Sequence, residues 1–167
     1  MIKLPQDFTP DERSEKAMAL FRQGYNCTQS VILAFADVLE NAGLVEEHTL
    51  KVIGSGFGGG MGRLREVCGA FSGCTMLAGF ISPADVPADM NARKENYAMV
   101  QEFAEKFKLA NGGSIVCREL LGLERKPQIE PPAPSVRTEE YYRKRPCVQI
   151  IGNAARIIAE KLIALSK

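Results

Sequence analysis

Apolar residues recur every three to four positions along almost the whole chain, and this spacing limits the fold more than any other feature of the sequence. It is typical of amphipathic helices, each of which buries one face. No stretch alternates between apolar and polar residues for long enough to predict a β-strand. The 167 residues also amount to about one domain's length. We therefore predict an all-α fold, in which residues 1–167 form a single-domain bundle of five to seven helices with a glycine-rich loop.

Local signals mark where the helices begin and end. Thr9 and Pro10 have the positions of an N-cap and a first helical residue, and Gly24 is expected to end that helix. Asn26 and Gln29 have the spacing of a capping box, which starts a second helix that continues to residues 41–43. The other predicted helices cover residues 46–53, 68–80, 91–109, 115–121 after a Ser114 cap, and Pro146 to the end of the chain.

The last predicted helix carries its apolar residues in an a/d rhythm, which continues to the end of the chain: Val148, Ile151, Ala155, Ile158, Leu162 and Leu165. Such a seam can line the core or the interface of a homodimer. A single seam of under three heptads is weak evidence for a coiled coil. We place it in the core and keep a homodimer as the alternative.

Two segments predict irregular backbone. Residues 126–137 hold four prolines in twelve positions and are expected to cross the surface. Residues 54–62 contain six glycines in nine positions, which predicts a loop. The G-x-G-x-x-G spacing in that run lacks the βαβ unit that a dinucleotide site requires, so we discount such a site. We expect Gly58, Gly59, Gly60 and Gly69 either to allow close packing beside Cys68 or to line a site for an anion, thiolate or cluster.

The charge balance excludes some partners. The formal net charge is +1, so no global field attracts the protein to nucleic acid or anionic lipid.

The longest apolar segment, residues 148–165, is interrupted by Asn153, Arg156, Glu160 and Lys161, which argues against an integral membrane protein. The first residues lack the apolar segment of a secretory signal. We expect a cytoplasmic protein, in which thiols do not rest as structural disulfides.

Cysteine placement carries most of the functional information. Four of the five cysteines, Cys27, Cys68, Cys117 and Cys147, fall in the first turns of predicted helices. Unsatisfied N–H groups and the positive end of the helix dipole favour a thiolate there. The dipole contributes only about 0.3–1 kcal/mol, less than the roughly 1.36 kcal/mol that one pKa unit requires. The fifth cysteine, Cys74, lies inside an apolar helix, and we interpret it as a core residue or an auxiliary thiol.

Thiolates at these positions therefore need a metal or nearby cations. The candidate cations are close in sequence: Arg63 and Arg65 before Cys68, Arg118 beside Cys117, and Arg143, Lys144 and Arg145 before Cys147.

Three functions fit this pattern. The first, which we favour, gathers the four cysteines at one end of the bundle beside the glycine loop for reversible thiol–disulfide or electron-transfer chemistry. The second is a metal or iron–sulfur module with four thiolate ligands from separate helices. The third is a helical interaction protein whose cysteines only pack. No C-x-x-C occurs, and His48, the only histidine, is expected to be solvated. The cofactor is therefore undetermined: none, a metal or an iron–sulfur cluster.

The sequence around each of the four cysteines is similar to that in a known family. The elements are Gly24-Tyr25-Asn26-Cys27, Cys68-Gly69-Ala70-Phe71-Ser72-Gly73 after a Gly-Gly-Met-Gly run, Cys117-Arg118-Glu119-Leu120-Leu121-Gly122, and Cys147 near the end. They resemble the C_GCAxxG_C_C family of redox-active proteins, over about residues 15–162. The resemblance implies a small helical protein with a thiol- or metal-based redox role, an unidentified redox partner and a link to transport. The family is also related to split-Soret cytochromes, but this chain lacks Cys-x-x-Cys-His, so we expect no covalent haem.

Overall fold

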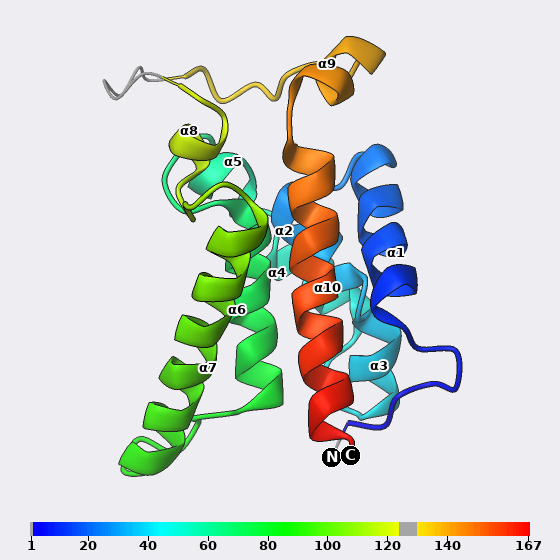
Figure 1. Ribbon diagram of the computed structural model, residues 1–167, viewed down its shortest axis with the longest axis vertical. Helices are drawn as coiled ribbons and strands as arrows, with labels where there is room; N and C mark the ends of the chain where they lie inside the picture. The colour runs from blue at the N-terminus through cyan, green and yellow to red at the C-terminus, as the bar shows by residue number, and fades with distance from the viewer. Residues whose placement is uncertain (1, 124–129) are drawn as a thin grey trace.

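The computed structural model describes residues 2–123 and 130–167, and these confirm the predicted all-α fold (Figure 1). All the predicted helical segments occur. The elements are α1 (Pro10–Arg22), α2 (Cys27–Leu33), α3 (Ala36–Asn41), α4 (Glu47–Ile53), α5 (Gly58–Met61), α6 (Gly69–Ile81), α7 (Met90–Ala110), α8 (Cys117–Leu120), α9 (Glu139–Lys144) and α10 (Cys147–Leu165). Within the described residues, none of these helices is long and apolar enough to cross a membrane.

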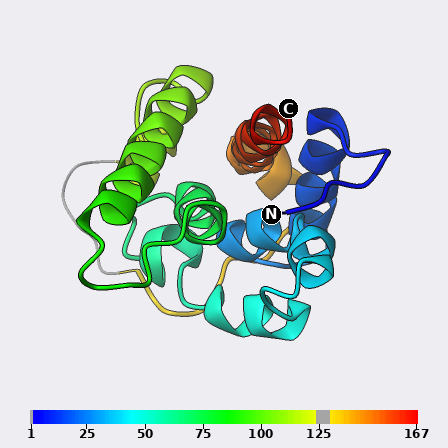
Figure 2. The same ribbon diagram turned by 90° about the horizontal axis from the view of Figure 1, so that it is seen from below.

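Helix α10 is the centre of the packing. It contacts α1, α2, α6 and α7, and it lies between α1 and α7 when the bundle is viewed from the end that carries both termini (Figure 2). Ile151, Ala155 and Ile158 of its apolar seam are fully buried, and Leu162 is nearly so. The seam therefore lines the core from Ile151 to Leu162, as predicted, whereas Val148 is only partly buried and Leu165 is exposed. Gly152 permits the close contact with α1, because a Cβ there would lie 2.8 Å from Ser14 Oγ.

The single helix predicted over residues 26–41 is divided into α2 and α3, which corrects that prediction. The break falls at Ala34 and Phe35. Arg13 of α1 is buried there, and its Nη1 donates to the Ala34 carbonyl oxygen at 2.7 Å. The same guanidinium binds both carboxylate oxygens of Asp37, at 2.6 and 2.9 Å. A buried cation thus occupies a carbonyl that a continuous helix would use itself.

The helix caps are partly as predicted. Thr9 accepts from the backbone N–H of Glu12, and the Asn26–Gln29 capping box is complete. The predicted Ser114 cap is wrong, because α8 begins only at Cys117. The residues before it form an antiparallel bridge between Val67 and Val116, which keeps them out of the helix.

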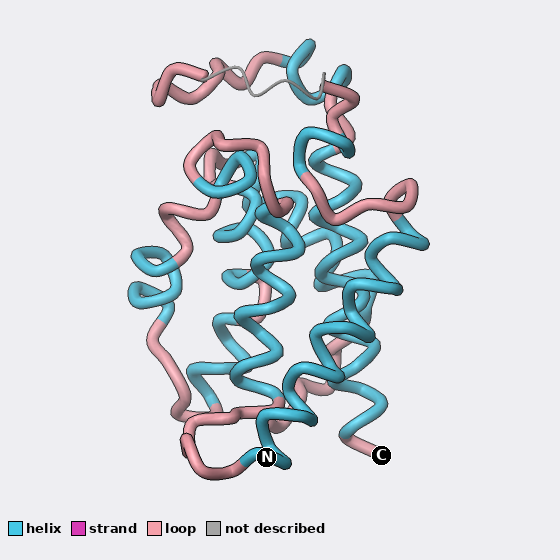
Figure 3. The backbone as a smooth tube through the Cα atoms, turned by 90° about the vertical axis from the view of Figure 1, so that its left-hand side faces the viewer, coloured by secondary structure: helices cyan, strands magenta, loops and turns pink. Residues whose placement is uncertain are grey.

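One end of the bundle is closed by loops and short helices. Helix α9, which the sequence analysis did not predict, lies at this end together with α5 and α8 (Figure 1). Of the predicted crossing segment, residues 130–137 contain no helix or strand, and residues 126–129 lie outside the described part of the chain. Both termini lie at the opposite end of the bundle (Figure 3). The closed end holds the site described below.

Arg13 provides a test of this packing. Replacing it with methionine (Arg13→Met) leaves the Ala34 carbonyl without its donor and Asp37 without its main partner. We expect the free energy of unfolding to fall by about 2–4 kcal/mol in urea denaturation. Lys16→Met is the matched control, since Lys16 also bonds Asp37 but is more exposed, and it should cost less than about 1 kcal/mol. Equal losses in the two variants would contradict this account.

Candidate functional site

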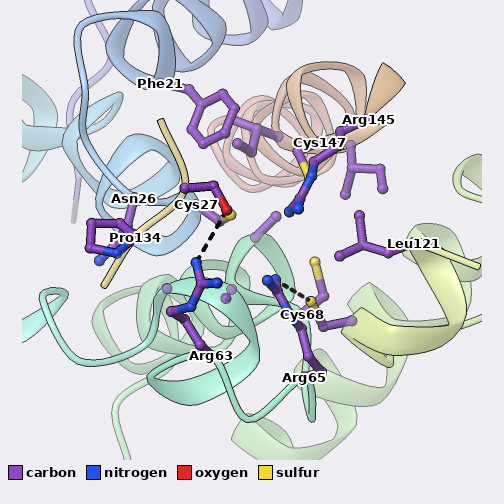
Figure 4. A pocket seen from close by; sticks show the side chains of 18 of the residues that line it. Phe21, Asn26, Cys27, Arg63, Arg65, Cys68, Leu121, Pro134, Arg145 and Cys147 are labelled. Carbon is purple, nitrogen blue, oxygen red and sulfur yellow. Dashed lines mark hydrogen bonds between the residues drawn. The ribbon is translucent and has the colours of Figure 1, made fainter. Parts of the chain in front are cut away.

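The structure brings the four predicted cysteines to one cavity of about 400 Å³ at the closed end of the bundle (Figure 4). Cys27, Cys117 and Cys147 are the first residues of α2, α8 and α10, and Cys68 immediately precedes α6. Their predicted positions at helix starts are therefore confirmed. No disulfide joins any of them in the described structure.

Cys27 and Cys147 form a coupled pair of thiols, and both are half-buried. Both line the cavity, and interaction with the Cys147 thiol is the main reason that the pKa of Cys27 falls to about 7. Burial opposes the shift, while the Gly59 backbone N–H and the charge of Arg137 support it. The pKa of Cys147 rises, because interaction with Cys27 and burial both favour its protonated form. Of the two thiols, Cys27 is therefore the first to ionise.

Cys68 and Cys117 are held in a different state. Both are buried, at 7% and 8% exposure. Burial, followed by the charge of Cys27, raises the pKa of Cys68 to about 12. Burial also raises the pKa of Cys117, although Arg65 Nη1 donates to its sulfur at 3.8 Å and limits the rise. Both thiols are therefore protonated at neutral pH.

Cys74 lies outside the cavity. It is fully buried in α6, and its thiol donates to the Ala154 carbonyl oxygen of α10 at 3.8 Å. Burial raises its pKa. Of the two predicted roles for Cys74, the structure favours the core residue.

Four arginines line the cavity: Arg63, Arg65, Arg137 and Arg145. Glu130 binds Arg65 through two hydrogen bonds of 2.9 and 2.6 Å, and it pairs with Arg63 at 3.0 Å. The hydrogen bonds from Arg65 lower the pKa of Glu130. This carboxylate lies beside two of the four cations and is not itself in the cavity wall.

The predicted pairing of cations with thiols is only partly right. Arg65 bonds Cys117, which follows it by 52 positions, and not the neighbouring Cys68. Arg118, predicted beside Cys117, donates to the Leu64 carbonyl oxygen and is not among the cavity residues. Arg143 and Lys144 are exposed.

The sequence analysis did not predict three further cavity residues: Phe21, Arg137 and Tyr141. Arg137 lies over the ring of Phe21 at 4.1 Å from its centroid. Tyr141 supports Arg145 in the same way, at 4.7 Å. No local signal in the sequence marked Arg137, because its partners belong to α1 and α2.

The glycine run forms a left-handed turn beside the thiols. Residues 59–63 all have φ between 57° and 69°. Cys68 and Cys117 are fixed next to this turn by backbone bonds, since the Cys68 N–H donates to Ile115 at 2.8 Å and the Cys117 N–H to Glu66 at 2.6 Å. Gly60 must lack a side chain, because a Cβ would lie 2.7 Å from the Cβ of Cys117.

The four glycines predicted at the site have two kinds of position. Gly58, Gly59 and Gly69 line the cavity, and the Gly59 backbone helps to lower the pKa of Cys27. Gly60 is not among the lining residues. A Cβ on Gly69 would lie 2.9 Å from both Cys27 Cβ and Thr28 Oγ1, so close packing beside a cysteine also applies there.

The residues that the structure describes contain no group of three or more His, Cys, Asp or Glu side chains placed to hold one metal ion. The four cysteines share a cavity without forming a ligand set in this arrangement. The metal or iron–sulfur module stays a prediction from the sequence.

A pair of glycine substitutions in α6 tests the close packing at the site. Gly69→Ala places a methyl group against Cys27 and Thr28, so we expect it to lower the free energy of unfolding by about 1–3 kcal/mol. Gly79→Ala is the matched control, because a Cβ there meets nothing within 4 Å; it should be neutral or stabilise by up to about 1 kcal/mol. Urea denaturation measures both. A neutral Gly69→Ala variant would show that the packing tolerates a side chain.

Comparison with known proteins identifies a family. No curated protein and no solved structure matches the chain. A family model described as "Putative redox-active protein (C_GCAxxG_C_C)" matches residues 25–161, a range that contains all four cavity cysteines. This match covers most of the chain, and the protein therefore belongs to the C_GCAxxG_C_C family of redox-active proteins.

Proposed function

We propose that the protein carries out reversible thiol–disulfide exchange, with Cys27 as the attacking thiolate and Cys147 as the resolving thiol. The single observation that supports this most is the position of these two half-buried cysteines in the wall of one cavity, where the Cys147 thiol lowers the pKa of Cys27. A thiolate, not a thiol, attacks a disulfide, and a pKa near ambient pH suits the attacking group. Both residues are half-buried, so a substrate entering the cavity can reach them.

The reaction has two steps. The Cys27 thiolate attacks one sulfur of a substrate disulfide, forms a mixed disulfide and releases the other half as a thiolate. Cys147 then gives up its proton to that leaving thiolate or to solvent, attacks the Cys27 sulfur and releases the second half. The substrate gains two electrons, with one proton from Cys147 and a second from solvent, and the protein gains a Cys27–Cys147 disulfide. The reverse direction reduces the protein with a substrate dithiol or two thiols.

Cys68 and Cys117 belong to the proposed site as a second pair of thiols. Their burial and high pKa values make them slow to react while Cys27 is reduced. Because the charge of Cys27 contributes to both raised pKa values, consuming that thiolate in a disulfide lowers the pKa of the second pair. The order of reaction therefore begins at Cys27.

The setting of this chemistry follows the sequence-based expectations. We expect the protein to act in the cytoplasm with a separate redox partner, and a link to transport is consistent with the family resemblance. Electron transfer through a bound metal is the second candidate. It is distinguished by elemental analysis of anaerobically purified protein, since stoichiometric metal would overturn the dithiol proposal.

Alkylation against pH tests the ionisation of Cys27. Below pH 7 the thiol is protonated and unreactive, and above it the thiolate reacts, so the rate at Cys27 should reach half its plateau near the pKa of about 7. Cys68 and Cys117 should stay unmodified at that pH. Iodoacetamide labelling with peptide mass spectrometry measures each site separately.

Two variants complete that test. Cys147→Ala removes the thiol that lowers the pKa of Cys27. That pKa should therefore rise, and the curve of Cys27 alkylation rate against pH should move to higher pH. Cys74→Ala, in the core, should leave the curve unchanged. If Cys27 instead reacts only above about pH 8.5, as an ordinary cysteine does, the activated-thiol proposal fails.

The disulfide itself is tested by oxidation with hydroxyethyl disulfide. We expect one new intramolecular link, between the peptides that contain Cys27 and Cys147, and no such link in Cys27→Ser. Cys74→Ala should form the link as the wild type does. Mass spectrometry of the digested protein identifies the linked peptides, and a first link formed between other cysteines would contradict the assignment.

A further inference from the structure

The cavity around the thiols carries an excess of positive charge. Among the lining residues that the structure describes, four are arginines and none is an aspartate or glutamate. Glu130 lies behind Arg63 and Arg65 and compensates part of their charge. Neither Arg137 nor Arg145 pairs with a carboxylate anywhere in the described residues. Even with Cys27 ionised, the cavity therefore keeps a net positive charge.

Arg137 and Arg145 are also held ready to bind an anion. Each guanidinium stacks on an aromatic ring, Arg137 on Phe21 at 4.1 Å and Arg145 on Tyr141 at 4.7 Å. Stacking fixes the plane of each guanidinium, and Arg137 Nη1 also donates to the Phe21 carbonyl oxygen. The other N–H donors at the edge of a stacked guanidinium have the geometry that receives a carboxylate. Both residues are partly buried, so a charge pair formed there is screened less than one on the surface.

The rest of the wall is apolar and the space is limited. Leu120, Leu121 and Ile150 line the cavity on one side, and Pro132 and Pro134 of the crossing segment line it on another. A volume of about 400 Å³ lies within the usual range of small-molecule sites. A folded protein surface does not fit such a space, but a small molecule with a short aliphatic body does.

We propose that the substrate of this site is a low-molecular-weight disulfide that bears carboxylate groups, which Arg145 and Arg137 bind while its sulfur meets Cys27. The inference rests on the proposed thiol–disulfide function. The arginines bind the carboxylates, and the exchange at sulfur follows the two steps given above. Each released half of the substrate leaves as a thiol that bears a carboxylate. Neutral and cationic disulfides lack the charge that the cavity selects.

The test compares three small disulfides of similar length: the dianion dithiodipropionate, neutral hydroxyethyl disulfide and the dication cystamine. We expect the rate constant for oxidation of the wild type at low ionic strength to be at least about tenfold higher for the dianion than for the neutral compound, and lowest for cystamine. Added salt should reduce this preference.

Arg145→Gln separates substrate binding from thiol activation, because Arg145 is not among the main causes of the lowered pKa of Cys27. It should lower the rate constant for the dianion by about tenfold, equivalent to about 1.4 kcal/mol, and leave the neutral compound within about twofold. Arg143→Gln, at an exposed position in α9 two residues before Arg145, is the matched control and should change neither. Loss of the reaction with all three disulfides in Arg145→Gln would overturn a role in selecting charge.

Suberate, the dicarboxylate that replaces the two sulfurs of dithiodipropionate with carbons, tests binding without redox chemistry. Calorimetry should detect suberate binding to the wild type and to Arg143→Gln, and binding about tenfold weaker or absent in Arg145→Gln. Suberate binding without any disulfide exchange would leave the anion site standing and overturn the proposed function. Exchange at equal rates with all three disulfides, without suberate binding, would overturn the anion preference alone.

Discussion

The site depends on the close approach of α2 and α6. Two glycines of α6 make it possible, since a Cβ on Gly69 would lie 2.9 Å from the Cβ of Cys27 and one on Gly73 would lie 2.8 Å from the Cβ of Val31. The buried hydroxyl of Thr28 fixes the register by donating to the Gly69 carbonyl oxygen at 2.7 Å. This contact aligns the starts of both helices at one end of the bundle. Cys27 and Cys68 therefore face the same cavity, which α8 and α10 complete with their own first residues.

Much of the fold could be predicted because its signals are local. The N-caps Thr9 and Asn26 act within three residues of their own positions, and the apolar period of α10 reports its buried face directly. The division of α2 from α3 could not be predicted in this way. It depends on a buried guanidinium that arrives from 21 residues earlier, and only the folded arrangement brings Arg13 to the Ala34 carbonyl.

The same distinction applies to the site. Helix starts are local features, so the placement of four cysteines there was within reach of the sequence. Which cation faces which thiol was not, because the cations come from other parts of the chain: Arg65 is 52 positions from Cys117, and Arg137 acts on Cys27 from across the cavity. The separation into one coupled, accessible pair and one buried pair also needs coordinates, since it depends on burial and on contacts between helices.

Among the residues described, the three outside glycine with positive φ are Met61, Arg63 and Arg65, all in or beside the glycine turn. A left-handed backbone costs an ordinary residue roughly 1–2 kcal/mol, and glycine would avoid that cost. Glycine occupies three of the neighbouring positions, whereas positions 63 and 65 hold arginine, with both side chains in the wall of the cavity. The ion pairs of both arginines with Glu130 offset part of that backbone cost. The turn thus places two fixed positive charges beside the thiols on a strained backbone.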